Sequence, residues 1–141
     1  NYVSALGLDI GRKRIGVAGC DLTGLIASGL TTLQRQSFQQ VVAELEQLVQ
    51  ERQVQILVVG LPYTMAGEEG FQARQVRKFA ERLSATLKLP VAYMDERLTS
   101  VEAEQLISAD RKSVAHNKAL IDRKAAAIIL QRWLDDRRKS I

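Results

Sequence analysis

Short apolar runs separated by polar turns fill the amino-terminal part of the chain. Two of them, Leu6–Ile10 and Ile15–Ala18, flank a polar segment that starts at Gly11 and carries three cations. This pattern predicts a β-hairpin. A third run, Ile26–Leu33, follows the polar segment 21–24 and predicts a strand that completes an antiparallel meander.

Helical and extended patterns alternate after this meander. Ser37 is placed as an N-cap, and apolar residues then recur at helical spacing to about residue 52. The continuous apolar run 55–60 is typical of a strand buried on both faces in a parallel arrangement. A helix over Phe71–Leu87 and a strand over Val91–Met94 follow. The order predicts an α/β fold with a mixed five-stranded sheet, namely a three-strand antiparallel meander plus two parallel strands, flanked by helices.

The remaining segments complete a single domain over residues 1–141. The glycine-containing segment 63–70 is expected to be a mobile loop beside the carboxyl ends of the strands. Thr99 and Glu102 fit a capping box for a short helix to about residue 108. The polar stretch 110–117 is expected to be a mobile loop before a last helix from about 118 to 136.

Composition and charge narrow the chemistry. The single cysteine, Cys20, cannot form an internal disulfide, and its distance in sequence from the only histidine, His116, disfavours catalytic thiol chemistry. One cysteine and one histidine are too few for a Cys/His zinc site. No apolar run approaches a membrane span, and we expect a cytoplasmic protein. Net charge is +4, but residues 1–73 contribute −2 and residues 74–141 contribute +6, which favours a polyanionic partner.

Acidic residues lie at two predicted strand ends and on one helix face. Asp9 shares a strand face with the small residues Ala5 and Gly7, because successive side chains alternate. Asp95 and Glu96 follow the last strand on opposite faces, and alternation alone does not choose between them. The alternative is that these acidic residues have no functional role and are solvated at the strand ends or form surface ion pairs.

The third acidic position is Asp122, which begins an apolar stripe on the last helix. Carboxylates that converge repel each other unless hard cations lie between them. The constellation therefore predicts a Mg²⁺ or Mn²⁺ site and metal-assisted phosphoryl chemistry. Cations expected to hold a phosphodiester backbone are Arg12, Lys13, Arg14, Arg97, Arg111, Lys112 and Lys118.

Five motifs in their order along the chain resemble the YqgF family, described both as pre-16S rRNA nucleases and as Holliday junction resolvases with an RNase H-like fold. They are Gly7-Leu8-Asp9-Ile10-Gly11, Arg14-Ile15-Gly16-Val17-Ala18, Val59-Gly60-Leu61-Pro62, Asp95-Glu96-Arg97-Leu98-Thr99-Ser100 and Asp122-x-x-Ala125-Ala126-Ala127-Ile128-Ile129-Leu130.

The resemblance implies that Asp9, Glu96 and Asp122 form a catalytic, metal-binding triad. It implies supporting roles for Asp95, Arg97 and Thr99. The loop segment 64–67 departs from the family pattern, which puts a polar loop contact to substrate in doubt. Related resolvases often carry a fourth acid one helical turn after the third, and alanine stands there in this chain, so the number of metal ions stays open.

The resemblance implies a nuclease that acts on structured RNA, specifically the 5′ end of pre-16S rRNA during ribosome biogenesis. One alternative is a resolvase of branched, four-way DNA, for which a homodimer rather than a monomer is expected. Another is a non-catalytic ribosome assembly factor with a ribosomal partner. Actin-like ATPases share the Leu8-Asp9-Ile10-Gly11 pattern, but this chain is too short for their two halves.

Overall fold

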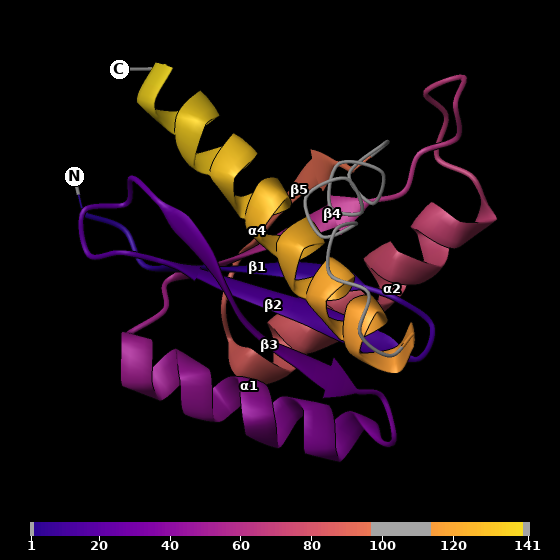
Figure 1. The fold of residues 1–141 in the computed structure, drawn as a ribbon, viewed down its shortest axis with the longest axis horizontal. Helices are drawn as coiled ribbons and strands as arrows, with labels where there is room; N and C mark the ends of the chain where they lie inside the picture. Colours follow the sequence, from indigo (N-terminus) through magenta and orange to yellow (C-terminus); the bar gives the residue numbers. More distant parts are fainter. Residues whose placement is uncertain (1, 97–113, 140–141) are drawn as a thin grey trace.

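The sheet holds five strands in a computed structural model that describes residues 2–96 and 114–139 (Figure 1). The strands are β1 (Ala5–Ile10), β2 (Arg14–Cys20), β3 (Ala27–Gln34), β4 (Ile56–Leu61) and β5 (Val91–Asp95). Their order across the sheet is β3-β2-β1-β4-β5. β1 pairs antiparallel with β2 and β2 with β3, while β4 runs parallel to both β1 and β5. The predicted meander and parallel strands are confirmed.

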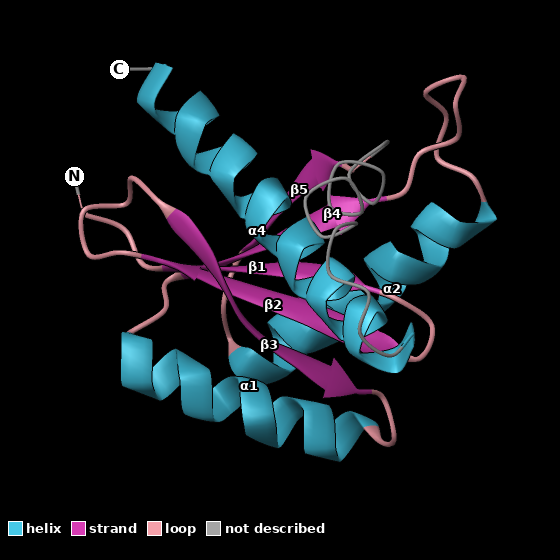
Figure 2. Ribbon diagram, in the orientation of Figure 1, coloured by secondary structure: helices cyan, strands magenta, loops and turns pink. Residues whose placement is uncertain are grey.

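Helices cover both faces of this sheet (Figure 2). α1 (Phe38–Arg52) and α2 (Phe71–Leu87) pack on one face, and α4 (Val114–Lys139) crosses the other. Ser37 caps α1 as predicted, because its hydroxyl accepts a hydrogen bond from the backbone N–H of Gln40 at 3.1 Å. The face of the sheet under α1 and α2 is called the α1/α2 face below, and the opposite one the α4 face.

The last helix is longer than predicted. Residues 114–117 were expected in a loop, but they form the first turn of α4, since the segment contains no glycine or proline that would break a helix. The helix also continues past residue 136 through Arg137, Arg138 and Lys139, cations that favour the negative end of a helix dipole. The short helix expected over 99–108 lies outside the described residues.

The two faces of the sheet differ in the size of their side chains. The α1/α2 face is built of large aliphatic residues such as Leu6, Leu8 and Val59, all fully buried. The α4 face carries mainly alanine and glycine on β1 and β2, with Val58 on β4. A Cβ added at Gly7 would lie 2.7 Å from the Cβ of Leu130, and one at Gly16 would lie 1.9 Å from the backbone oxygen of Asp122. The small residues therefore let α4 approach the strands closely.

Two further observations bear on the sequence analysis. Cys20 is buried, and its thiol lies 3.4 Å from the carbonyl oxygen of Val3. Within the described ranges 2–96 and 114–139, none of the helices combines the length and the apolar character that a bilayer crossing requires.

Candidate active site

Asp9 lies near the carboxyl end of β1, on the α4 face. Its Cα partner across the hairpin is Gly16, and Gly7 on the same face is paired with Ala18. Opposed residues of an antiparallel pair share a face, so Asp9 is surrounded by small residues and the backbone of α4. The sequence prediction that Asp9 lies on a face of small residues is confirmed.

Glu96 reaches the same face from the end of β5. The parallel ladder pairs Gly60 with Met94, and the backbone N–H of Glu96 extends it by donating to the carbonyl of Leu61 at 3.1 Å. Because alternate residues share a face, Glu96 follows Met94 onto the α4 face. A Cβ added at Gly60 would lie 2.8 Å from the Glu96 Oε2 atom. Gly60 therefore leaves the space that the Glu96 carboxyl group occupies.

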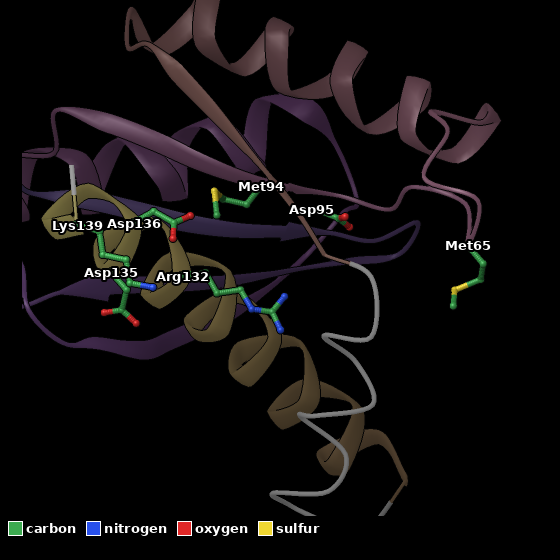
Figure 3. A pocket seen from close by; sticks show the side chains of 7 residues that line it. All are labelled: Met65, Met94, Asp95, Arg132, Asp135, Asp136 and Lys139. Atoms are coloured by element: carbon green, nitrogen blue, oxygen red, sulfur yellow. The ribbon is translucent and has the colours of Figure 1, made fainter.

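The structure brings Glu96, rather than its neighbour Asp95, into contact with Asp9. Asp95 instead borders a hollow of about 560 Å³ between β5 and α4, which Met65, Met94 and Arg132 also line. Figure 3 shows Asp95 at the end of β5 and Arg132 on the neighbouring helix. Asp95 still acts on Glu96 through its charge, which helps to raise the pKa of Glu96.

The Asp9 and Glu96 carboxyl groups share a hydrogen bond in a buried setting. Burial, and then the charge and hydrogen bond of Asp9, raise the pKa of Glu96 to about 9. Burial also raises the pKa of Asp9, and the charge of Asp122 adds to this, while the hydrogen bond from Glu96 acts in the opposite direction. At neutral pH the Glu96 carboxyl group therefore keeps its proton and donates it in the hydrogen bond to Asp9.

Asp122 lies near this pair but is held by a cation. Its Oδ2 accepts a hydrogen bond from the Arg14 Nε at 2.7 Å, in an ion pair whose side chains are 28% (Arg14) and 19% (Asp122) exposed. Among the residues that the structure describes, no three acidic, histidine or cysteine side chains are gathered closely enough to hold a metal ion. Two of the three predicted ligands are thus in contact, and the third is paired with Arg14.

The donor set fits a hard divalent cation. Asp9 and Glu96 offer carboxylate oxygens, the ligands that Mg²⁺ and Mn²⁺ prefer. The proton that they share offsets the repulsion between two buried carboxyl groups, and a bound cation would offset it in the same way. Asp122 would have to leave Arg14 to join them. Ala125 and Ala126, one turn further along α4, are buried against the sheet and supply no fourth acid.

The predicted phosphate-binding cations fall into three groups. Arg12 and Lys13 are exposed in the turn between β1 and β2, and Lys118 is exposed near the start of α4. Arg14, assigned to the same task, contacts Asp122 instead. Outside the described residues lie Arg97, Thr99, Arg111 and Lys112.

One cation near the site was missed from the sequence. Arg35 follows β3, and its Nη1 donates to the carbonyl of Gly11 at 2.6 Å, so its guanidinium lies against the hairpin turn. Its backbone N–H donates to the carbonyl of Lys13 at 2.9 Å. The predicted meander could have indicated this position of Arg35, because the third strand of an antiparallel meander ends next to the turn that joins the first two.

Comparison with known proteins gives a family match over almost the whole chain. The model of the RuvX family, described as "Holliday junction resolvase", matches residues 3–136. A "Putative pre-16S rRNA nuclease" of Trichormus variabilis is 65% identical over 137 residues, covering 97% of this chain and 91% of the relative. A protein of the same name from Crocosphaera subtropica is 65% identical over 139 residues, covering 99% and 97%.

Solved structures share the fold at low sequence identity. Thermus thermophilus RuvC in complex with a Holliday junction substrate is similar with a TM-score of 0.60 and 14% identity, over 99% of this chain and 98% of RuvC. Fowlpox virus resolvase in complex with Holliday junction DNA is similar with a TM-score of 0.55 and 13% identity, over 95% and 98%. The RNase H-like fold implied by the motifs is confirmed.

Proposed function

The chain belongs to the RuvX family, which is the same family as YqgF, and we propose that it is a metal-dependent nuclease. Its proposed reaction is the hydrolysis of phosphodiester bonds of pre-16S rRNA. The observation that carries the proposal is the buried, proton-sharing pair of Asp9 and Glu96 at the carboxyl ends of two strands. Two carboxyl groups placed together in a site of low polarity are costly without a cation, and such arrangements cluster at functional sites.

We assign Asp9 and Glu96 as ligands of Mg²⁺ or Mn²⁺, with Asp122 as the third after it exchanges from Arg14. The bound cation would supply Lewis-acid stabilisation of the phosphate and a water activated as nucleophile. To hold the cation, the carboxyl pair would release its shared proton to solvent. Arg14 stays beside the site as a positive charge, and the exposed Arg12 and Lys13 hold the phosphodiester backbone by charge.

The substrate assignment follows the relatives that cover the whole chain, which are named as pre-16S rRNA nucleases. We propose processing at the 5′ end of this precursor during ribosome biogenesis, which places the protein in the cytoplasm, alone or with a ribosomal partner. The excess of basic residues in the carboxyl-terminal half supports a polyanionic substrate, because most protein contacts to nucleic acids are made to phosphates.

The test is cleavage of labelled precursor rRNA with Mg²⁺ or Mn²⁺, by the parent and by Asp9→Asn and Glu96→Gln. We expect the parent to cut only with metal, and each variant to lose about a thousandfold in rate, since charge stabilisation by a metal is worth several kcal/mol. Glu46→Gln, the same change at an exposed position of α1, is the matched control and should cut normally. Full activity of Asp9→Asn would contradict the proposal.

A second candidate is a resolvase of four-way DNA junctions, favoured by the family description and by the full-length likeness to RuvC. The same variants should be assayed on a synthetic junction beside the RNA. Cutting of the junction alone, by a homodimer, would establish this activity and overturn the rRNA assignment. Salt-dependent RNA binding without cleavage, unchanged in Asp9→Asn, would indicate a ribosome assembly factor instead.

A further inference from the structure

A second hollow, of about 710 Å³, opens at the carboxyl end of β1 on the α1/α2 side of the sheet. We name it the α2 groove. It is lined by residues 10–12, Arg35, Phe71, Gln72, Gln75 and Val76. Its wall begins one residue after Asp9, so the groove and the carboxyl pair lie on opposite faces of one strand end.

The charge of the groove is positive. Arg12 and Arg35 line it together, and no acidic side chain from residues 2–96 or 114–139 does. Within the ranges that the structure describes, no ion pair joins either arginine to a carboxylate. Arg35 is also fixed in place, because it donates to Gly11 and stacks over the Phe79 ring with its guanidinium carbon 4.1 Å from the ring centre. A cation held in this way loses little conformational entropy when it binds a phosphate.

An exposed aromatic ring stands beside these cations. Phe71 begins α2 and is 61% exposed, although α2 offers buried positions such as Val76 within the next two turns. Gln72 and Gln75 are exposed next to it and carry amide donors and acceptors. An exposed ring together with arginines and amides is the arrangement on which proteins stack the bases of single-stranded nucleic acids.

We propose that the α2 groove binds unpaired RNA nucleotides next to the bond that is cut, with phosphates on Arg12 and Arg35 and a base stacked on Phe71. The inference rests on the proposed nuclease function and adds the class of substrate, a single-stranded flank. A base inside a duplex is already stacked on its neighbours, so only an unpaired base reaches Phe71. Duplex RNA would engage the arginines alone.

The experiment measures binding without cleavage. A fluorescein-labelled ten-nucleotide RNA and a blunt RNA duplex of the same length are titrated with parent and variants in EDTA, by anisotropy. A second single strand carries 2-aminopurine, whose fluorescence falls when the base stacks. We expect the parent to prefer the single strand and to quench 2-aminopurine, and the control Glu46→Gln, at an exposed position of α1, to behave like the parent.

Phe71→Ala should weaken single-strand binding about tenfold and abolish the quenching, while Phe71→Tyr, which keeps a ring, should retain both. Leu22→Ala, which removes a side chain that is 86% exposed, is the control for lost apolar area. Arg12→Ala should lower the slope of log affinity against log salt concentration by about 0.7. Lys124→Ala, at an exposed position of α4, should leave that slope unchanged.

Equal affinity for single strand and duplex, or undiminished quenching in Phe71→Ala, would overturn the proposal. The result is separate from the nuclease assignment, because no metal is present. If the parent cuts no substrate yet binds single strands through Phe71, the groove assignment holds and the nuclease proposal alone fails.

Discussion

The two faces of the sheet differ in role: the α1/α2 face forms the large aliphatic core, and the α4 face holds the candidate active site. On the α1/α2 face, Leu6, Leu8, Ile15 and Leu57 are fully buried and pack against residues of two helices. On the α4 face β1 and β2 present mainly glycine and alanine, and α4 lies on them. The strands are therefore asymmetric, with bulk on one side and space on the other.

The space on the α4 face is what allows a polar site in the middle of a sheet. At Gly16 the backbone of α4 occupies the space of a side chain, and at Gly60 the Glu96 carboxyl group does. Asp9, Glu96 and Asp122 then lie on the same side of the sheet. The opposite face supplies the apolar burial that offsets the cost of the buried carboxyl groups.

The largest expected effect comes from breaking the asymmetry at Gly16. We expect Gly16→Ala to lose about 3 kcal/mol or more of unfolding free energy, because its Cβ would lie 1.9 Å from the Asp122 backbone oxygen and α4 would have to move. Gly19→Ala is the matched control in the same strand. Its Cβ would meet only the flexible ends of Arg52 and Leu30, so we expect a loss below about 1 kcal/mol. Urea unfolding measures both, and similar losses would contradict the comparison.

A smaller effect concerns the carboxyl pair in the metal-free protein. The pKa of Glu96 rises from its ordinary 4.5 to about 9 on folding, so between these values the folded state binds a proton that the unfolded state lacks. Stability from this group is full below pH 4.5 and falls as pH rises towards 9, by up to about 1.4 kcal/mol per pH unit.

Glu96→Gln should reduce this pH dependence and stabilise the metal-free protein at pH 8, because the neutral amide does not have to take up a proton when the chain folds. The measurement is urea unfolding at pH 5 and pH 8 in EDTA, with Glu46→Gln as control. A parent that is more stable at pH 8 than at pH 5, with no change in this difference in Glu96→Gln, would contradict the expectation.

The smallest expected change in stability comes from breaking either of two partly exposed ion pairs, one on each side of the sheet. Arg14→Ala breaks the contact with Asp122, and Arg77→Ala breaks the 2.7 Å contact with Glu69. We expect each to cost about 1 kcal/mol or less. Only Arg14→Ala should tighten Mn²⁺ binding in calorimetry, since it frees a predicted ligand. Equal Mn²⁺ affinity in both variants would argue against Asp122 as a ligand.

Local sequence patterns predicted most helices and strands, but they could not predict contacts between residues distant in the sequence. The bounds of α2 agree with the prediction, because its stripe is periodic and Gly70 and Lys88 flank it. The start of α4 was placed four residues late, because the stretch 110–117 is polar overall and its two apolar residues, Val114 and Ala115, are too few to show a helical period. The pairing of Arg14 with Asp122 joins residues 108 positions apart, and no local pattern could predict it.

By itself, the sequence determined the strands, the helices and the presence of acids at two strand ends and on α4, because these follow from periodicity and local chemistry. Only the tertiary structure decided which acids meet. Alternation left Asp95 and Glu96 equivalent, and the register of β5 against β4 placed Glu96 on the α4 face with Asp9. Register is set by packing between segments distant in sequence, and a shift of one residue would have exchanged the two acids.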